Sequence, residues 1–180
     1  KFKSYQAREL EVDGIQPSLV TTPESVDDLS DALANASQEQ LAVTPAGGRT
    51  QISVGNPPDR LDMVLDVSRV NRILEHNPAD LTVTVEAGIT FATLQNTLKE
   101  HGQFLAIDPP LPRRATIGGT LARGVAGPMT WQGWSPRDLT IGMRIVLASG
   151  KFSNSGGKVV KNVSGYDLAR LHIGGLGTLG

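Results

Sequence analysis

The stretch LAVTPAGGRTQIS, residues 41–53, joins a short apolar run to a proline and a pair of glycines. A buried strand that opens into glycines is typical of nucleotide-binding loops, because consecutive glycines let several backbone N–H groups turn toward one anion. The stretch nevertheless matches neither G-x-G-x-x-G nor G-x-x-x-x-G-K-[ST]. Two interpretations stay open: a plain turn after a strand, or a nest of amides for a phosphate, with the hydroxyls of Thr50 and Ser53 as further donors.

The composition of the chain excludes several classes of function. Its 180 residues suit one domain or two small lobes that share a core. With 17 Lys and Arg against 18 Asp and Glu, the formal net charge is −1, and the absence of a basic stripe argues against nucleic-acid binding. No apolar run approaches the ~20 residues of a membrane span. No secretory signal pattern is visible, so we expect a cytoplasmic protein.

Metal and cysteine chemistry are also disfavoured. The chain has no cysteine, which excludes disulfides, thiolate metal sites and a cysteine nucleophile. Its histidines, His76, His101 and His172, are scattered along the chain, so we expect no metal site. Neither G-x-S-x-G nor H-E-x-x-H occurs.

Hydrophobic periodicity places the opening stretch in a β-α-β unit. Residues 18–20 and 41–44 are predicted strands that form a parallel pair, followed by a third strand at 63–67. The helix between the first two is predicted to have Thr22 as its cap and Pro23 at its first position.

A second lobe is expected to begin near Gly88. A hairpin precedes it, with strands at 72–76 and 81–87, and Thr90 is the predicted cap of the helix that follows. The remaining predicted elements are a strand at 104–107, a short helix at 116–122, two strands within 141–155 and a helix at 166–173.

Glycine makes up 20 of the 180 residues, and it gathers again in the segment 108–128, DPPLPRRATIGGTLARGVAGP. Small residues dominate this segment, which favours a wall against an extended ligand. The amides of Gly118 and Gly119, at a helix start, are candidate phosphate donors. Tight packing of a helix on a sheet is the alternative interpretation.

A third glycine-rich segment, GGKVVKNVSGYDLARLHIGGLGTLG, occupies residues 156–180. Glycines this dense beside a helix favour close approach to a ligand. Lys158 and Lys161 are either functional cations or part of a solvated face, and Tyr166 and Asp167 are expected to serve capping and packing.

The three segments, taken in order, resemble the FAD-binding domain of the vanillyl-alcohol-oxidase/p-cresol-methylhydroxylase (PCMH-type) group of flavoproteins. The likeness covers about residues 17–180, and the third segment is most similar to the flavin subunits of bacterial glycolate oxidases among the FAD-linked oxidases. It implies a two-lobed α+β fold with FAD between the lobes. A small βαβ lobe would span about 17–88, and a larger lobe with a mixed or antiparallel sheet flanked by helices would span about 89–180.

The resemblance also implies which residues contact FAD. The first loop would wrap the pyrophosphate through its backbone amides, the second segment would follow the pyrophosphate and the flavin ring, and the final Gly-Thr-Leu-Gly would approach the cofactor through its backbone. Asp138 matches an acidic position before the central strand. The implied cofactor-binding residues are Ala46, Gly47, Gly48, Arg49, Thr50, Gln51, Thr116, Ile117, Gly118, Gly119, Leu121, Ala122, Gly127, Pro128, Asp138, Gly177, Thr178 and Gly180.

One departure from the family pattern concerns how FAD is attached. Covalent members carry a histidine in the first loop, where this chain has Arg49. With no cysteine in the chain either, the resemblance implies non-covalent FAD.

The implied function is flavin-dependent oxidation of a 2-hydroxy acid such as glycolate, by hydride transfer to FAD. The family's catalytic residues lie in a C-terminal substrate domain that is absent from these 180 residues, so we expect the chain alone to be inactive and to bind FAD weakly. Other oxidase subunits are possible partners, and the protein would then lie in the cytoplasm or at the membrane periphery. The alternatives are a non-catalytic flavin-domain subunit for assembly or electron relay, and an adenine-nucleotide module without flavin.

Overall fold

The computed structural model describes residues 10–124, 127–157 and 168–180. Its first part is a three-stranded parallel sheet with strand order β1-β3-β2, formed by β1 (Leu19–Thr21), β2 (Val43–Ala46) and β3 (Met63–Asp66). Met63 of β3 is in register with Leu19 on one side and with Val43 on the other. The expectation that β1 and β2 form a pair is therefore wrong. The strands are parallel, but β3 lies between them because it is the most buried of the three and is covered on both faces.

Two apolar clusters use opposite faces of β3. Val64, which is fully buried, packs with Val20, Ala46 and neighbours on one face. On the other face, Met63 and Leu65 pack against α1 (Val26–Gln38) through Ala32 and Ala36, as well as other apolar residues. The alternation follows from the two-residue period of a strand.

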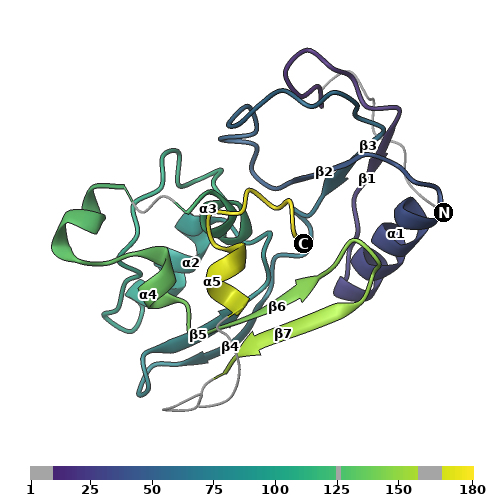
Figure 1. Cartoon of the computed structure of the whole chain (residues 1–180). Coiled ribbons are helices and arrows are strands. Elements are labelled where there is room, and N and C mark those ends of the chain that lie inside the picture. The colour runs from purple at the N-terminus through teal and green to yellow at the C-terminus, as the bar shows by residue number, and fades with distance from the viewer. Residues whose placement is uncertain (1–9, 125–126, 158–167) are drawn as a thin grey trace.

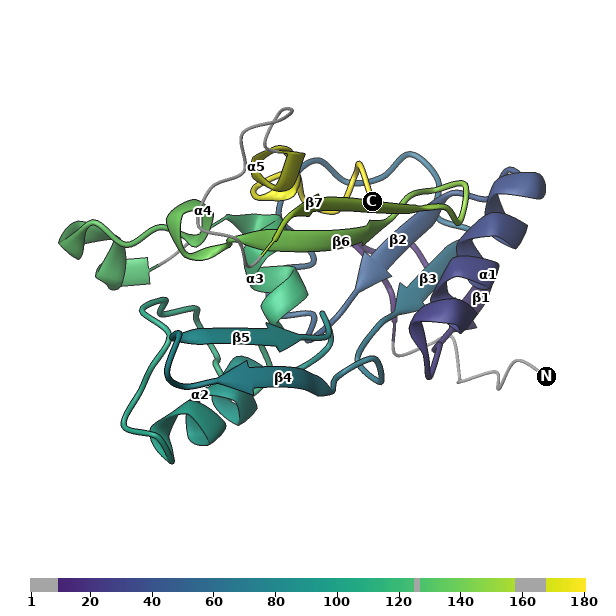
Figure 2. The same ribbon diagram turned by 90° about the horizontal axis from the view of Figure 1, so that it is seen from below.

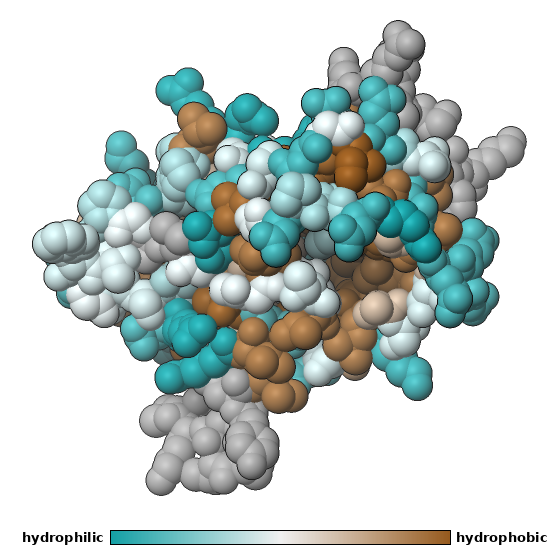
Figure 3. All heavy atoms as spheres, turned by 45° about the horizontal axis from the view of Figure 1, so that its top comes forward, coloured by the Kyte–Doolittle hydropathy of each residue, from teal (hydrophilic) through white to brown (hydrophobic). Residues whose placement is uncertain are grey.

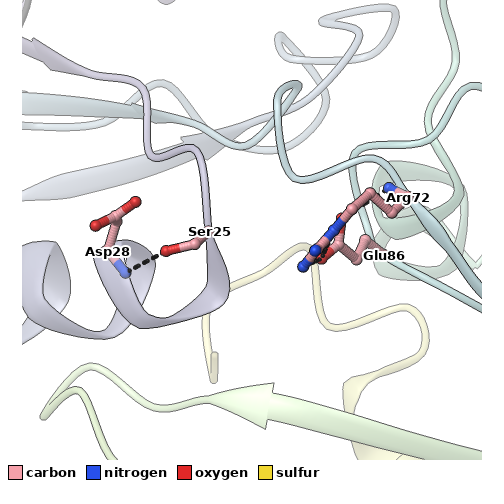
Figure 4. Close-up of polar contacts among 4 residues, drawn as sticks. All are labelled: Ser25, Asp28, Arg72 and Glu86. Carbon is pink, nitrogen blue, oxygen red and sulfur yellow. Dashed lines mark hydrogen bonds and ion pairs between the residues drawn. The ribbon is translucent and has the colours of Figure 1, made fainter.

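The cap of α1 differs from the prediction. Ser25, in extended backbone conformation, accepts a hydrogen bond from the Asp28 N–H at 3.0 Å (Figure 4). Thr22 is therefore not the cap, and Pro23 precedes the helix rather than opening it. Ser25 is the better placed residue because Asp27 and Asp28 follow it in the first turn, where acidic side chains complement the helix dipole.

The second part of the chain begins with a hairpin and a helix, as predicted. The strands are β4 (Ile73–Asn77) and β5 (Thr82–Val85), and α2 (Phe91–Lys99) is capped by Thr90. Residues 104–107, however, do not form a strand. The side-chain amide of Gln95 exchanges two hydrogen bonds of 2.9 Å with the backbone of Leu105 and takes the place of a partner strand.

The remaining elements lead back to the first sheet. They are α3 (Ile117–Arg123), the 3-10 helix η2 (Gly127–Gln132), α4 (Pro136–Leu139), the antiparallel strands β6 (Gly142–Val146) and β7 (Phe152–Gly156), and α5 (Leu168–His172). Figures 1 and 2 show the β6–β7 hairpin reaching from α5 to α1. There the Ser30 hydroxyl donates to the Gly150 carbonyl at 2.6 Å.

The predicted α+β architecture is confirmed: a parallel βαβ unit is followed by antiparallel hairpins flanked by helices. The residue limits proposed for the two lobes stay a prediction. Within the described residues, no helix is both long enough and apolar enough to cross a membrane.

Candidate functional site

The first glycine loop lies directly against the second glycine segment. A Cβ atom added to Gly47 would overlap the Thr116 side chain, and one added to Gly48 would overlap the Arg114 carbonyl group. The loop starts where β2 ends at Ala46, whose carbonyl accepts a hydrogen bond from the Val67 N–H at 2.8 Å. Both glycines are therefore required by the contact between the two loops.

The start of α3 is tied to the connection between β5 and α2. The Ile117 N–H donates to the Ile89 carbonyl at 2.9 Å, and the Gly118 N–H donates to the Ala87 carbonyl at 2.8 Å. The Gly119 N–H donates to the Thr116 hydroxyl at 3.3 Å. The hypothesis that Gly118 and Gly119 present their amides to a phosphate is wrong, because both amides have protein acceptors.

Packing accounts for Gly118 but not for Gly119. A Cβ on Gly118 would lie 2.7 Å from the Cβ of Ala87, whereas one on Gly119 would approach only the Thr116 hydroxyl, at 3.1 Å. Gly119 is exposed. The surface of α3 at Gly119 is thus open and carries no side chain, although no neighbouring protein atom requires a glycine at this position.

The third segment runs along α3 to the end of β2. The Gly174 N–H donates to the Leu121 carbonyl at 3.0 Å, and the Leu176 N–H donates to the Ala122 carbonyl at 2.8 Å. Farther on, a Cβ on Gly177 would lie 3.0 Å from Pro45, just before the first loop. Figure 1 shows the C-terminal segment between α3 and β2. The fold therefore brings the three glycine segments together.

Several amides of the first loop lack protein partners. Among the described residues, the N–H groups of Gly47, Gly48 and Thr50 have no acceptor. Arg49, between them, has φ +55, in the left-handed region. A left-handed residue within a short turn is the geometry in which successive amides converge on an anion. The loop retains the features of an anion nest.

Positive side chains surround this part of the molecule. Arg49, Arg113 and Arg114 are exposed around the loop contact. The Nε atom of Arg123, at the end of α3, is buried and has no hydrogen-bond partner in the described part of the chain. A guanidinium group with a buried, unsatisfied nitrogen is costly unless an acceptor is supplied. In Figure 3 the molecule is turned so that the top of Figure 1 comes toward the viewer. On this face, apolar side chains gather around a hollow.

Three of the predicted site residues, Gly127, Pro128 and Asp138, follow α3 in the chain. A Cβ on Gly127 would overlap the Asp108 carbonyl, and Pro128 is exposed beside it. Asp138 accepts a hydrogen bond from the Ser135 hydroxyl within the turn of α4. That turn is linked to the third segment by Arg137, whose Nη2 donates to the Ile173 carbonyl at 3.3 Å. Lys158, Lys161, Tyr166 and Asp167 lie outside the described residues.

An ion pair between the buried Glu86 and the exposed Arg72 fixes the hairpin that leads into α2. The Glu86 side chain is 3% exposed and accepts hydrogen bonds from the Arg72 guanidinium at 2.7 and 3.1 Å (Figure 4). The Arg72 backbone N–H donates to the same carboxylate at 2.7 Å. The guanidinium hydrogen bonds hold the pKa of Glu86 below its ordinary value, against the opposing effect of burial. The pair is structural: it anchors the end of β5, to which α3 is bound through Ala87.

Three residues that shape this site were not among those predicted from the sequence. Ala87 binds the start of α3, Arg114 contacts Gly48, and Arg123 carries the unsatisfied nitrogen. Arg114 and Arg123 lie within the segment 108–128, where arginines among small residues were a usable signal. Ala87 offered none, because its role depends on a long-range contact.

Comparison with known proteins identifies a family. The sequence model of a family described as "FAD binding domain" matches residues 17–156. Glycolate oxidase subunit GlcD of Bacillus subtilis is 34% identical over 164 residues, covering 91% of this chain and 35% of that protein. Glycolate oxidase subunit GlcE of Escherichia coli is 36% identical over 154 residues, covering 84% of this chain and 43% of that protein. The chain thus spans less than half the length of each of these relatives.

A solved structure shows the same fold. The structure described as alkyldihydroxyacetonephosphate synthase superimposes with a TM-score of 0.76 at 25% identity, over 92% of this chain and 32% of that one.

No group of three or more metal-ligating side chains occurs among the described residues.

Proposed function

The chain belongs to the FAD-binding domain family, and we propose that it is the cofactor-binding domain of a flavin-dependent oxidoreductase that oxidises a 2-hydroxy acid such as glycolate. Its cofactor is FAD. The relatives named glycolate oxidase subunits, and one named D-2-hydroxyglutarate dehydrogenase from Xanthomonas citri at 33% identity, support this substrate class. The structural observation that carries the proposal is the meeting of three glycine segments around amides without acceptors.

The residues present suit the pyrophosphate of FAD. In the proposed site, residues 46–51 wrap the pyrophosphate through backbone amides, and the amides of Gly47, Gly48 and Thr50 are available for it. The exposed Arg49 and Arg114 add positive charge, and charge-assisted hydrogen bonds to phosphate are among the stronger polar contacts in proteins.

The other proposed contacts are made by small surfaces rather than by amides. Thr116, Ile117, Gly118 and Gly119, with Leu121 and Ala122, form a wall along the pyrophosphate and the flavin ring. The exposed surface of Gly119 supports this role. Gly127 and Pro128 extend the wall, and Asp138 stands behind it. Gly177, Thr178 and Gly180 approach the cofactor from the third segment, which is supported by the contact of Gly177 with Pro45.

FAD is bound reversibly in this proposal, because Arg49 replaces the histidine of covalent members and the chain has no cysteine. When bound, the flavin supplies a hydride acceptor, while the protein supplies binding and orientation. No catalytic side chain is assigned to residues 1–180. The substrate contacts belong to a further domain of a longer protein, which we place in the cytoplasm.

A second candidate is a non-catalytic flavin-domain subunit of an oxidase complex. It is favoured by the similarity to two proteins that are both named as subunits of glycolate oxidase. Such a protein would bind FAD and serve assembly or electron relay with other subunits.

Anaerobic titration of the full-length protein with glycolate and with other 2-hydroxy acids separates these candidates. Bleaching of the visible flavin band supports the oxidoreductase. A yellow protein that no 2-hydroxy acid bleaches supports the non-catalytic subunit. A protein that stays colourless with FAD in excess contradicts both and leaves the adenine-nucleotide module.

A further inference from the structure

Two arginines lie next to one exposed glycine of the third segment. A Cβ atom added to Gly174, which has φ +84, would approach only Nη2 of Arg137, at 3.9 Å. A Cβ atom added to Gly124 would lie 2.9 Å from the Cα of the same Gly174, and Arg123 precedes Gly124 at the end of α3. The contact between α3 and the third segment therefore brings two basic residues to one small stretch of exposed backbone.

The Arg123 side chain has no hydrogen-bond partner in the described part of the chain. Its Nε atom is buried and unsatisfied, whereas its two Nη atoms are not among the buried atoms that lack a partner. Because Arg123 as a whole is half-buried, the guanidinium group is packed at Nε and accessible at its two Nη atoms. A buried nitrogen without a partner is rare in proteins and requires an explanation.

Neither arginine has an acidic partner among the described residues, where the ion pairs join other side chains. Asp138 follows Arg137 in the chain, but its carboxylate accepts a hydrogen bond from the Ser135 hydroxyl. Two positive side chains beside one glycine repel each other unless a negative group lies near both. The arrangement therefore favours an anion at this position.

The ends of the helices explain only one of the two arginines. Basic side chains stabilise helix C-termini, and Nη2 of Arg137 donates to the Ile173 carbonyl, just after α5, at 3.3 Å. The last carbonyls of α3, those of Leu121 and Ala122, already accept N–H groups of the third segment. The guanidinium group of Arg123 therefore has no acceptor at the end of its own helix.

The end of α3 is distant from the loop proposed for the pyrophosphate. Thr116 lies against Gly47 of that loop, and Arg123 is seven residues farther on, about 10 Å along the helix axis. In the proposed site Leu121 and Ala122 lie along the flavin ring, and a substrate that donates a hydride has to lie against that ring. An anion at Arg123 is therefore better explained by the substrate than by the pyrophosphate.

We propose that Arg123 and Arg137 form a carboxylate site: the Nη atoms of Arg123 bind the carboxylate of the 2-hydroxy acid, and Arg137 adds a second positive charge. A guanidinium group matches the two oxygen atoms of a carboxylate and binds them with charge-assisted hydrogen bonds. This inference rests on the proposed function and deepens it, because it adds one contact from this domain to the substrate contacts of the further domain.

The first measurement is an NMR titration of the 180-residue chain without FAD. The Nε–H signal of Arg123 is assigned by its loss in Arg123→Lys. The probes are glycolate, ethylene glycol, which lacks the carboxylate, and inorganic phosphate, all at one ionic strength. We expect a saturable shift of the Arg123 signal with millimolar glycolate, none with ethylene glycol and a smaller one with phosphate. No shift with glycolate, or a shift with phosphate alone, would overturn the carboxylate site.

The second measurement uses the full-length protein with FAD bound. Loss of a charged hydrogen-bond donor predicts a KM for glycolate at least about tenfold higher in Arg123→Gln. The kcat should stay within about twofold, because the contact is made equally in the ground state and the transition state. Arg123→Lys should lie between this variant and the wild type. FAD affinity and melting temperature, measured alongside, should not change.

Lys151→Gln is the matched control, because it removes the same charge from an exposed position between β6 and β7. Its KM should equal that of the wild type. Equal KM values in Arg123→Gln and Lys151→Gln would overturn the inference. If no 2-hydroxy acid reduces the full-length protein, the proposed function fails, and the NMR titration still decides whether Arg123 binds a carboxylate.

Discussion

The backbone of Gly48 lies directly against the carbonyl group of Arg114, 66 residues farther along the chain. Gly47 lies in the same way against Thr116, the cap of α3. The two glycine segments are thus parts of one structure, in which the glycines allow the loops to touch. Beside this contact, the N–H groups of Gly47, Gly48 and Thr50 have no acceptor in the described part of the chain.

The substitution Gly48→Ala tests the contact itself. Its Cβ would overlap a backbone carbonyl, which cannot rotate away, so we expect a loss of about 2 kcal/mol or more in the free energy of unfolding. FAD binding should weaken as well, because the loop moves. Gly157→Ala is the control, since a Cβ there meets no atom within 4 Å. Equal melting temperatures for the two variants would contradict the contact between Gly48 and Arg114.

Gly119→Leu tests the open surface of α3. Because Gly119 is exposed and leucine favours helices, the variant should keep its stability within about 0.5 kcal/mol. Its side chain would occupy the proposed cofactor wall, so FAD binding should fall by more than about tenfold. Gly118→Ala should show the reverse: lower stability from contact with Ala87, and a smaller effect on FAD. Unchanged FAD affinity in Gly119→Leu would remove this residue from the proposed site.

The Glu86–Arg72 pair predicts the acid sensitivity of the fold. The pKa of Glu86 is lower in the folded state than in the unfolded state, so the unfolded chain takes up the proton first and acid favours unfolding. This contribution is present above the ordinary glutamate pKa of about 4.3 and is lost as the pH falls through the folded value. Glu86→Gln should therefore flatten the dependence of melting temperature on pH below about pH 5.

The pH dependence of Glu86→Gln is compared with a background from Asp62 and with a control variant at Glu24. Asp62, whose pKa is lowered by a hydrogen bond from the Ala42 N–H, leaves a residual slope in the variant. Glu24→Gln is the exposed control, because its pair with Arg69 lies at the surface. Parallel profiles for the wild type and Glu86→Gln would show that the pair does not contribute.

Ser25→Ala tests the observed cap of α1. Removal of an N-cap hydroxyl costs about 1 kcal/mol, and we expect that loss in chemical denaturation, with no change in FAD binding. Thr22→Ala replaces the cap expected from the sequence and should have a smaller effect. A larger loss in the free energy of unfolding for Thr22→Ala than for Ser25→Ala would indicate that Thr22 is the cap.

Local patterns in the sequence predicted most of the elements. The β4–β5 hairpin, the Thr90 cap of α2, the short helix α3 and the β6–β7 hairpin are confirmed. Each depends on residues near one another in the chain, such as a turn between alternating strands or a hydroxyl three residues before its partner.

The errors arose where distant residues decide the structure. The position of β3 between β1 and β2 depends on burial over both faces of the sheet. Residues 104–107 are not a strand because the Gln95 side chain satisfies their backbone. The Gly118 amide was expected to face a ligand, but Ala87, in the preceding connection, accepts its hydrogen bond. Glycine clustering indicated close approach without showing whether protein or cofactor is the neighbour.

Equilibrium titration of the chain with FAD, followed by acid precipitation of the complex, tests the central claim most directly. The account predicts saturable binding of one FAD per chain, weak in the 180-residue chain and weaker still in Gly119→Leu, with all flavin released into the supernatant. The absence of saturable binding with FAD in large excess would contradict the proposed site, and flavin that stays with the precipitated protein would contradict its reversible attachment.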